Sequence, residues 1–131
     1  KLHTCHVGDV RGYLFGSDGL ERLTADHSYV GSLVEQGKLS EEDARHHPER
    51  NVVTQAIGLD VPLPDTTSRA LDPGDTVLLC SDGLWGAVAD AEMAEILASS
   101  TSARQRAAVL VDRAIDAGGH DNITAVLYQH S

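Results

Sequence analysis

The central stretch of the chain reads Thr76-Val77-Leu78-Leu79-Cys80-Ser81-Asp82-Gly83. Its residues from Thr76 to Cys80 are apolar or β-prone without polar alternation, which predicts a strand buried on both faces. The turn Asp72-Pro73-Gly74-Asp75 precedes this strand, and Asp82-Gly83 ends it. A carboxylate at the end of a buried strand sits on rigid backbone beside a cleft, which is the placement a metal ligand needs.

Working outward, turn signals separate six further β-prone stretches, at residues 2–8, 12–15, 20–23, 51–58, 66–71 and 123–128. Four helices are expected between them, each with a polar residue able to cap its start: Ser28, Ser40, Asp90 and Ser102. Most links between strands are too short for parallel crossovers. The pattern therefore predicts an α+β fold in which helices cover antiparallel sheet.

Composition narrows the class of protein. The chain has 131 residues, with 10 basic against 20 acidic side chains and a net charge of −10. It carries no basic run, which argues against a nucleic-acid partner, and its longest apolar run, Ala107 to Val111, is far too short to span a membrane. Because the chain starts at Lys1 and its only methionine is Met93, we interpret it as a piece of a longer protein. Cys5 and Cys80 are expected to be buried thiols in a reducing compartment.

Three aspartates next to or near glycines stand where predicted strands meet turns: Asp9, Asp82 and Asp121. Carboxylates with few histidines around them suit hard cations such as Mg²⁺ or Mn²⁺. For each aspartate alone, ordinary turn chemistry is the alternative.

Five segments together resemble the C-terminal half of the type-2C (metal-dependent, PPM-type) Ser/Thr protein phosphatases, with a bacterial-like flap. The segments fall in the family's order at residues 6–13, 23–28, 55–58, 74–84 and 118–124. The resemblance implies an antiparallel β-sandwich flanked by helices in four α-β-β-α layers, present here as an incomplete half. Residues 1–131 would form that half of a single domain, with a flap insert at about 28–53.

The same resemblance implies two Mn²⁺ or Mg²⁺ ions, with a third, weaker one. Asp82 and Asp121 match family metal ligands, Asp9 matches a ligand of the third ion, and Asn122 and Gly83 match residues that support the site. Val10 departs from the family, which usually has serine there. The bridging aspartate, the phosphate-binding arginine and the general acid are expected in the missing half, so no catalytic residue beyond the metal ligands is assigned, and the fragment alone is expected to be inactive.

The implied activity is hydrolysis of phosphoserine and phosphothreonine by a metal-activated water. Phosphorylated proteins would be the substrates, a Ser/Thr kinase or its targets the partners, and the cytoplasm the location, with neither nucleic acid nor membrane involved. A non-catalytic pseudophosphatase, acting as a regulatory or cation-binding fragment, is the alternative, whereas a simple acidic interaction domain leaves the five segments unexplained. Asp26 and His27, at the base of the flap, are open to a substrate-side or a structural role.

Overall fold

A computed structural model describes residues 1–131 as six strands and five helices. In chain order these are β1 (Leu2–His6), β2 (Arg11–Gly16), β3 (Gly19–Arg22), α1 (Tyr29–Glu35), α2 (Glu41–His46), β4 (Asp65–Arg69), β5 (Thr76–Cys80), α3 (Asp82–Trp85), α4 (Asp90–Leu97), α5 (Ala103–Asp116) and β6 (Ala125–Gln129). The longest helix, α5, has 14 residues, and no helix has the length and apolarity needed to cross a membrane.

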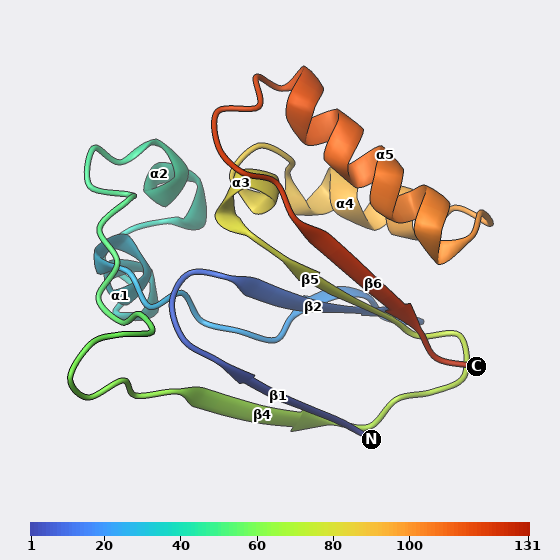
Figure 1. Cartoon of the computed structure of the whole chain (residues 1–131), viewed down its shortest axis with the longest axis horizontal. Helices are drawn as coiled ribbons and strands as arrows, with labels where there is room; N and C mark the ends of the chain where they lie inside the picture. The colour runs from blue at the N-terminus through green and yellow to red at the C-terminus, as the bar shows by residue number, and fades with distance from the viewer.

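The strands form two sheets in which every pairing is antiparallel. Four strands pair in the order β3-β2-β5-β6, and β1 pairs with β4 in a separate two-stranded sheet. Helices α4 and α5 lie on one side of the larger sheet, and the β1–β4 pair lies on the other (Figure 1). The predicted α+β class, with helices covering antiparallel sheet, is confirmed.

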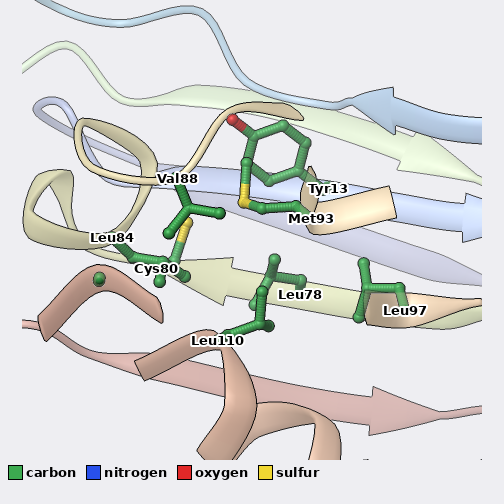
Figure 2. Packing of buried hydrophobic residues seen from close by; sticks show 9 residues of the cluster. Tyr13, Leu78, Cys80, Leu84, Val88, Met93, Leu97 and Leu110 are labelled. Atoms are coloured by element: carbon green, nitrogen blue, oxygen red, sulfur yellow. The ribbon is translucent and has the colours of Figure 1, made fainter. Parts of the chain in front are cut away.

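The hydrophobic core fills the space between the larger sheet and its helices. Tyr13 and Leu78 point from paired positions of β2 and β5 toward Met93 of α4 and Leu110 of α5, and all four side chains are fully buried (Figure 2). Cys80 belongs to the same cluster, and burial raises the pKa of its thiol to about 12. The thiol of Cys80 is therefore inert at neutral pH.

The face of the larger sheet turned away from the helices is covered only in part. Val77 is buried on this face, but Leu79, Val126 and Tyr128 are 47%, 53% and 55% exposed. The prediction that β5 is buried on both faces is therefore wrong at Leu79, because no element of this chain covers that position.

Three other local predictions are wrong. Residues 51–58 form turns rather than a strand, with one isolated bridge from Val53 to Ser28 and with Ile57 92% exposed. Cys5 is exposed, because it lies on the open side of the two-stranded sheet. Asp90 is the first residue of α4 rather than its cap, and its carboxylate accepts hydrogen bonds from Tyr13 and Arg45 instead.

The capping residues of the other three helices are confirmed. The side chains of Ser28, Ser40 and Ser102 each accept a hydrogen bond from a backbone N–H in the first turn, and Ser102 forms a complete capping box with Gln105. These caps fix where the two flap helices and α5 begin.

Candidate metal centre

A cavity of about 660 Å³ opens between the end of the larger sheet and the flap helices. All three predicted metal ligands, Asp9, Asp82 and Asp121, line it, although they are far apart in sequence. Gly83 also lines this cavity, and Val10 beside Asp9 is 45% exposed. The fold therefore gathers the predicted carboxylates at one site.

The segments that carry Asp82 and Asp121 are fastened to each other. The Ser81 hydroxyl donates to the Asn122 carbonyl at 3.1 Å and accepts from the Thr124 N–H at 3.0 Å. Gly83 lies so close that a Cβ built on it would meet the Asn122 carbonyl oxygen at 2.2 Å. The two segments therefore meet at the Asn122 carbonyl and at Gly83, where a side chain would not fit.

Replacing Gly83 by alanine should push the Asp82 and Asp121 segments apart. The opposing atom is backbone and cannot rotate away, so we expect a loss of about 1–3 kcal/mol in the free energy of unfolding, as for other overpacked sites. Urea denaturation measures this change. Gly12→Ala is the matched control, because a Cβ there meets its nearest atoms only at 3.4 and 3.5 Å. Equal losses in the two variants would contradict the assignment of this contact to Gly83.

The backbone of Asp9 is fixed by a hydrogen bond, and its side-chain carboxylate lies near that of Asp82. The indole N–H of Trp85 donates to the Asp9 carbonyl at 2.9 Å. Burial raises the pKa of the Asp9 carboxyl above its ordinary value, and the charge of Asp82 raises it further. The two carboxylates lie close together although their negative charges repel each other. A divalent cation bound between them would offset these charges, and carboxylate oxygens are the ligands that such a cation takes.

Asp9→Asn should stabilise the metal-free chain at pH 7. A raised folded-state pKa means that the ionised carboxylate opposes folding above that pKa, and this penalty disappears when the group is protonated. The gain in the free energy of unfolding should therefore shrink as pH falls through the raised pKa toward the ordinary value near 3.8. Urea denaturation in EDTA between pH 3.5 and 8 measures this difference, and a gain that grew on acidification would contradict it.

Arg11 organises the rear of the site, a role that the sequence did not reveal. Its guanidinium makes two hydrogen bonds to Asp26, at 2.9 and 2.7 Å, and a third to the Tyr13 hydroxyl. It also stacks over the Trp85 ring with 3.7 Å to the ring centroid. Because Asp26 is fully engaged and its side chain is only 9% exposed, the structure favours the structural role over the substrate-side one.

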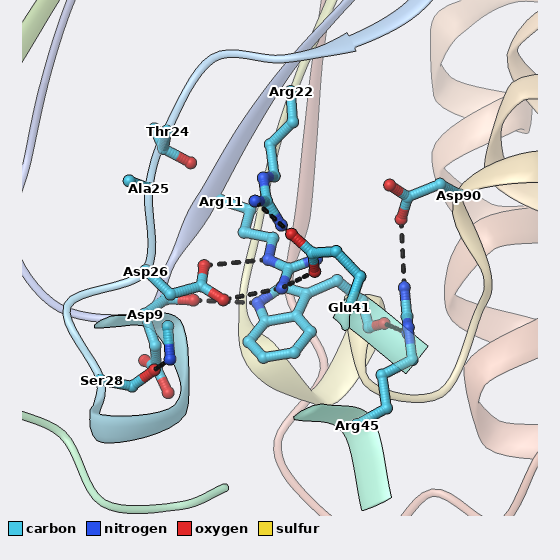
Figure 3. A network of polar contacts seen from close by, with 12 residues as sticks. Asp9, Arg11, Arg22, Thr24, Ala25, Asp26, Ser28, Glu41, Arg45 and Asp90 are labelled. Atoms are coloured by element: carbon cyan, nitrogen blue, oxygen red, sulfur yellow. Dashed lines mark hydrogen bonds and ion pairs between the residues drawn. The ribbon is translucent and has the colours of Figure 1, made fainter. Parts of the chain in front are cut away.

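Side chains of α2 attach the flap to β3 and to the helices α3 and α4. Glu41 pairs with Arg22 at 2.6 Å, and Arg45 reaches the Trp85 carbonyl at 2.5 Å and Asp90 at 3.2 Å (Figure 3). Burial opposes ionisation of Glu41, but Arg22 outweighs it and lowers the pKa of this carboxyl. Three of the four arginines that line the cavity, Arg11, Arg22 and Arg45, are therefore already paired with acids, whereas Arg50 forms no ion pair.

Asp9, Asp82 and Asp121 remain without a basic partner, since none of them forms an ion pair within 4.0 Å. The Asp121 carboxylate accepts one hydrogen bond, from the N–H of Asn122 to one of its oxygens at 2.7 Å. Unpaired carboxylates gathered in one cavity fit hard divalent cations. Their ligand atoms do not all lie within 4.8 Å of one another, which the cluster of His6, His27 and Asp65 alone achieves.

Comparisons with known proteins agree with this fold. The family model described as protein phosphatase 2C matches residues 53–123. The serine/threonine phosphatase stp of Listeria innocua is 42% identical over 127 residues, covering 96% of this chain and 50% of that protein. The crystal structure of the Mycobacterium tuberculosis serine/threonine phosphatase PstP/Ppp superimposes with a TM-score of 0.91 at 35% identity, over 98% of this chain and 55% of that one.

A further structure, the catalytic domain of the phosphatase PstP in complex with 2 manganese ions, superimposes with a TM-score of 0.81 at 34% identity, over 95% of this chain and 51% of that one. The fold of this chain is therefore that of the serine/threonine phosphatases in these structures. The chain belongs to the protein phosphatase 2C family, and it spans about half the length of the curated relatives it matches.

Proposed function

We propose that the protein to which this chain belongs hydrolyses phosphoserine and phosphothreonine in other proteins, and that residues 1–131 form the C-terminal half of its single phosphatase domain. The observation that carries this proposal is the cavity in which Asp9, Asp82 and Asp121 meet without basic partners. Support also comes from relatives named as serine/threonine phosphatases that match nearly the whole chain.

In this proposal Asp82 and Asp121 hold two Mn²⁺ or Mg²⁺ ions and Asp9, with Asp82, holds a third. The related domain described with 2 manganese ions supports Mn²⁺. When bound, such ions supply a water of lowered pKa and offset charge at the phosphate. The chain's own residues bind and orient: the contact of Gly83 with Asn122 keeps the two segments together, and Trp85 fixes the Asp9 backbone.

Three of the four arginines that line the cavity, Arg11, Arg22 and Arg45, are paired with Asp26, Glu41 and Asp90. None of these three is free to bind a phosphate, and the fourth arginine of the lining, Arg50, lies on the flap and donates to the His47 carbonyl. This arrangement supports placing the phosphate-binding arginine and the general acid in the half that this chain does not contain. The same pairing argues for a cavity whose free charge is negative, and a phosphate dianion would enter it only after cations had bound.

The direct test is release of phosphate from a phosphothreonine peptide by the intact protein, with and without Mn²⁺. Mn²⁺-dependent release supports phosphatase activity. No release at any Mn²⁺ concentration, with Mn²⁺ binding retained, would favour the pseudophosphatase alternative, in which the chain binds cations for a regulatory purpose.

The flap, residues 28–53, is proposed to select among phosphoproteins. Its helices have 7 and 6 residues and depend on tertiary contacts such as the pair of Glu41 with Arg22. Replacing it by the flap of another family member should change relative rates on two phosphopeptides by several-fold, while hydrolysis of a small aryl phosphate continues. Parallel loss of both activities would instead place the flap in the catalytic machinery.

A further inference from the structure

His27 lies behind the candidate metal centre and contacts the loop that carries Asp9. Its backbone N–H donates to the Gly8 carbonyl at 2.9 Å, and its ring Nδ1 accepts from the Gly8 N–H at 3.2 Å. Both polar backbone groups of Gly8 are thus bonded to one residue. Gly8 itself is buried and has φ +100°, a conformation that favours glycine.

The hydrogen bonds define the protonation of His27. The Gly8 N–H is a fixed donor, so Nδ1 presents a lone pair, and the ring proton resides on Nε2. Nε2 lies 2.9 Å from the Asp65 carboxylate and donates to it, which also lowers the pKa of Asp65. The ring of His6 stacks on the ring of His27, with 4.6 Å between the ring centroids. The Nε2 of His6 itself donates to the Ala25 carbonyl at 2.8 Å.

These bonds argue against a metal ion among His6, His27 and Asp65, close as their ligand atoms are. A cation at Nε2 of His27 would move the ring proton to Nδ1, where it would oppose the Gly8 N–H. A cation at Nε2 of His6 would take away the bond to the Ala25 carbonyl, and Nδ1 of His6 alone does not complete a three-ligand site without His27. The cluster is therefore a hydrogen-bonded support rather than a metal site.

Asp26 and His27 form hydrogen bonds to the residues that flank Asp9 in the chain. His27 binds Gly8, the residue before Asp9, and Asp26 binds Arg11, two residues after it. Trp85 holds the carbonyl of Asp9 itself. The chain is thus held by backbone bonds at Gly8 and Asp9 and by the side chain of Arg11, while the repulsion of Asp82 acts on the Asp9 carboxylate. Holding a ligand in place before the ion arrives is what strengthens metal binding.

We propose that His27, oriented by Asp65, is a positioning residue that fixes Gly8 and thereby holds the Asp9 carboxylate beside Asp82 for the weaker metal ion. This role rests on the proposed metal centre. Since His27 touches neither the reacting atoms nor the ion, it acts only through the backbone on which Asp9 stands. Its loss should therefore change the affinity for the weaker ion and leave turnover at saturating ion unchanged.

The chain offers a matched pair of variants. The amide oxygen of His27→Asn can stand near the position of Nδ1 and accept the Gly8 N–H, whereas the longer side chain of His27→Gln places its amide near Nε2, within reach of Asp65 but not of Gly8. Calorimetric titration of the intact protein with Mn²⁺ should show the weaker site about 10–100-fold weaker in His27→Gln, as for other residues that support metal ligands. His27→Asn should stay within a few-fold of the parent.

A second readout separates positioning from general damage. Hydrolysis of a small aryl phosphate by His27→Gln should need more Mn²⁺ but return to the parental kcat at saturation, with a thermal unfolding midpoint in EDTA close to that of His27→Asn. A kcat that no Mn²⁺ concentration restores would overturn the proposal in favour of a structural role.

Asp9→Asn is the benchmark for the weaker site. If Asp9→Asn weakens Mn²⁺ binding and His27→Gln does not, the positioning role is wrong and the metal centre stands. If Asp9→Asn leaves Mn²⁺ binding unchanged, the assignment of Asp9 fails, and the positioning role fails with it. Visible absorption bands of bound Co²⁺ that persist in Asp9→Asn and vanish in His6→Phe would also overturn the proposal, because they would show a metal ion in the histidine cluster.

Discussion

Replacing Asp82 by asparagine should abolish Mn²⁺-dependent phosphate release by the intact protein. The amide keeps the shape of the side chain but loses the negative charge that faces both Asp9 and the cavity. Supporting residues around metal ligands alone account for about 10–100-fold in affinity or activity, so loss of a ligand shared between ions should exceed about 100-fold. Initial rates on a small aryl phosphate over a range of Mn²⁺ concentrations measure this effect.

Asp121→Asn should have a comparable effect, because its remaining amide oxygen can still accept the Asn122 N–H while the carboxylate charge is gone. The control is Asp72→Asn, an exposed turn residue whose side chain makes no hydrogen bond or ion pair. Parental turnover by Asp82→Asn at saturating Mn²⁺ would remove Asp82 from the metal centre and with it the proposed mechanism.

The 131-residue chain by itself should show no phosphatase activity, and addition of the complementary half of its phosphatase domain should restore it. Alone, the chain has three unpaired carboxylates in its cavity and an incompletely covered sheet face at Leu79, Val126 and Tyr128. Like charges without a bridging ligand bind cations weakly, and exposed apolar sheet favours association with whatever covers it. Hydrolysis of a small aryl phosphate is compared for the chain, the mixture and the intact protein.

Two variants locate the surface that this complementation uses. Val126→Glu places a charge on the open sheet face and should reduce recovered activity by at least about tenfold, since burying an unpaired charge opposes docking by more than about 1.4 kcal/mol. Val109→Glu is the matched control on α5, on the far side of the helix layer, with a similar exposure of 42% against 53%. Turnover by the chain alone, lost in Asp82→Ala, would show that this half already contains a complete active site.

Local sequence was sufficient to predict the positions of most helices and strands. The capping serines, the turn at residues 72–75 and the apolar run from Thr76 to Cys80 each act through neighbours within a few residues, so their helices and strand lie where they were predicted. The four-residue helix α3 was missed, because it has neither a side-chain cap bond nor enough length to show a period. The predicted strand at 51–58 failed for the opposite reason, since β-prone residues form no strand without a partner.

The sequence also predicted three carboxylates, from their position next to or near glycine at the ends of strands, and the structure places all three in the lining of one cavity. The sequence could not determine what surrounds them. The engagement of Asp26 by Arg11, the stacking of Arg11 on Trp85 and the bond from His27 to Gly8 join residues 15 to 74 positions apart in the chain. Only the pairing of β2 with β5 and the path of residues 23–28 bring them together, because hydrogen bonds and ring contacts depend on distances that local propensity does not encode.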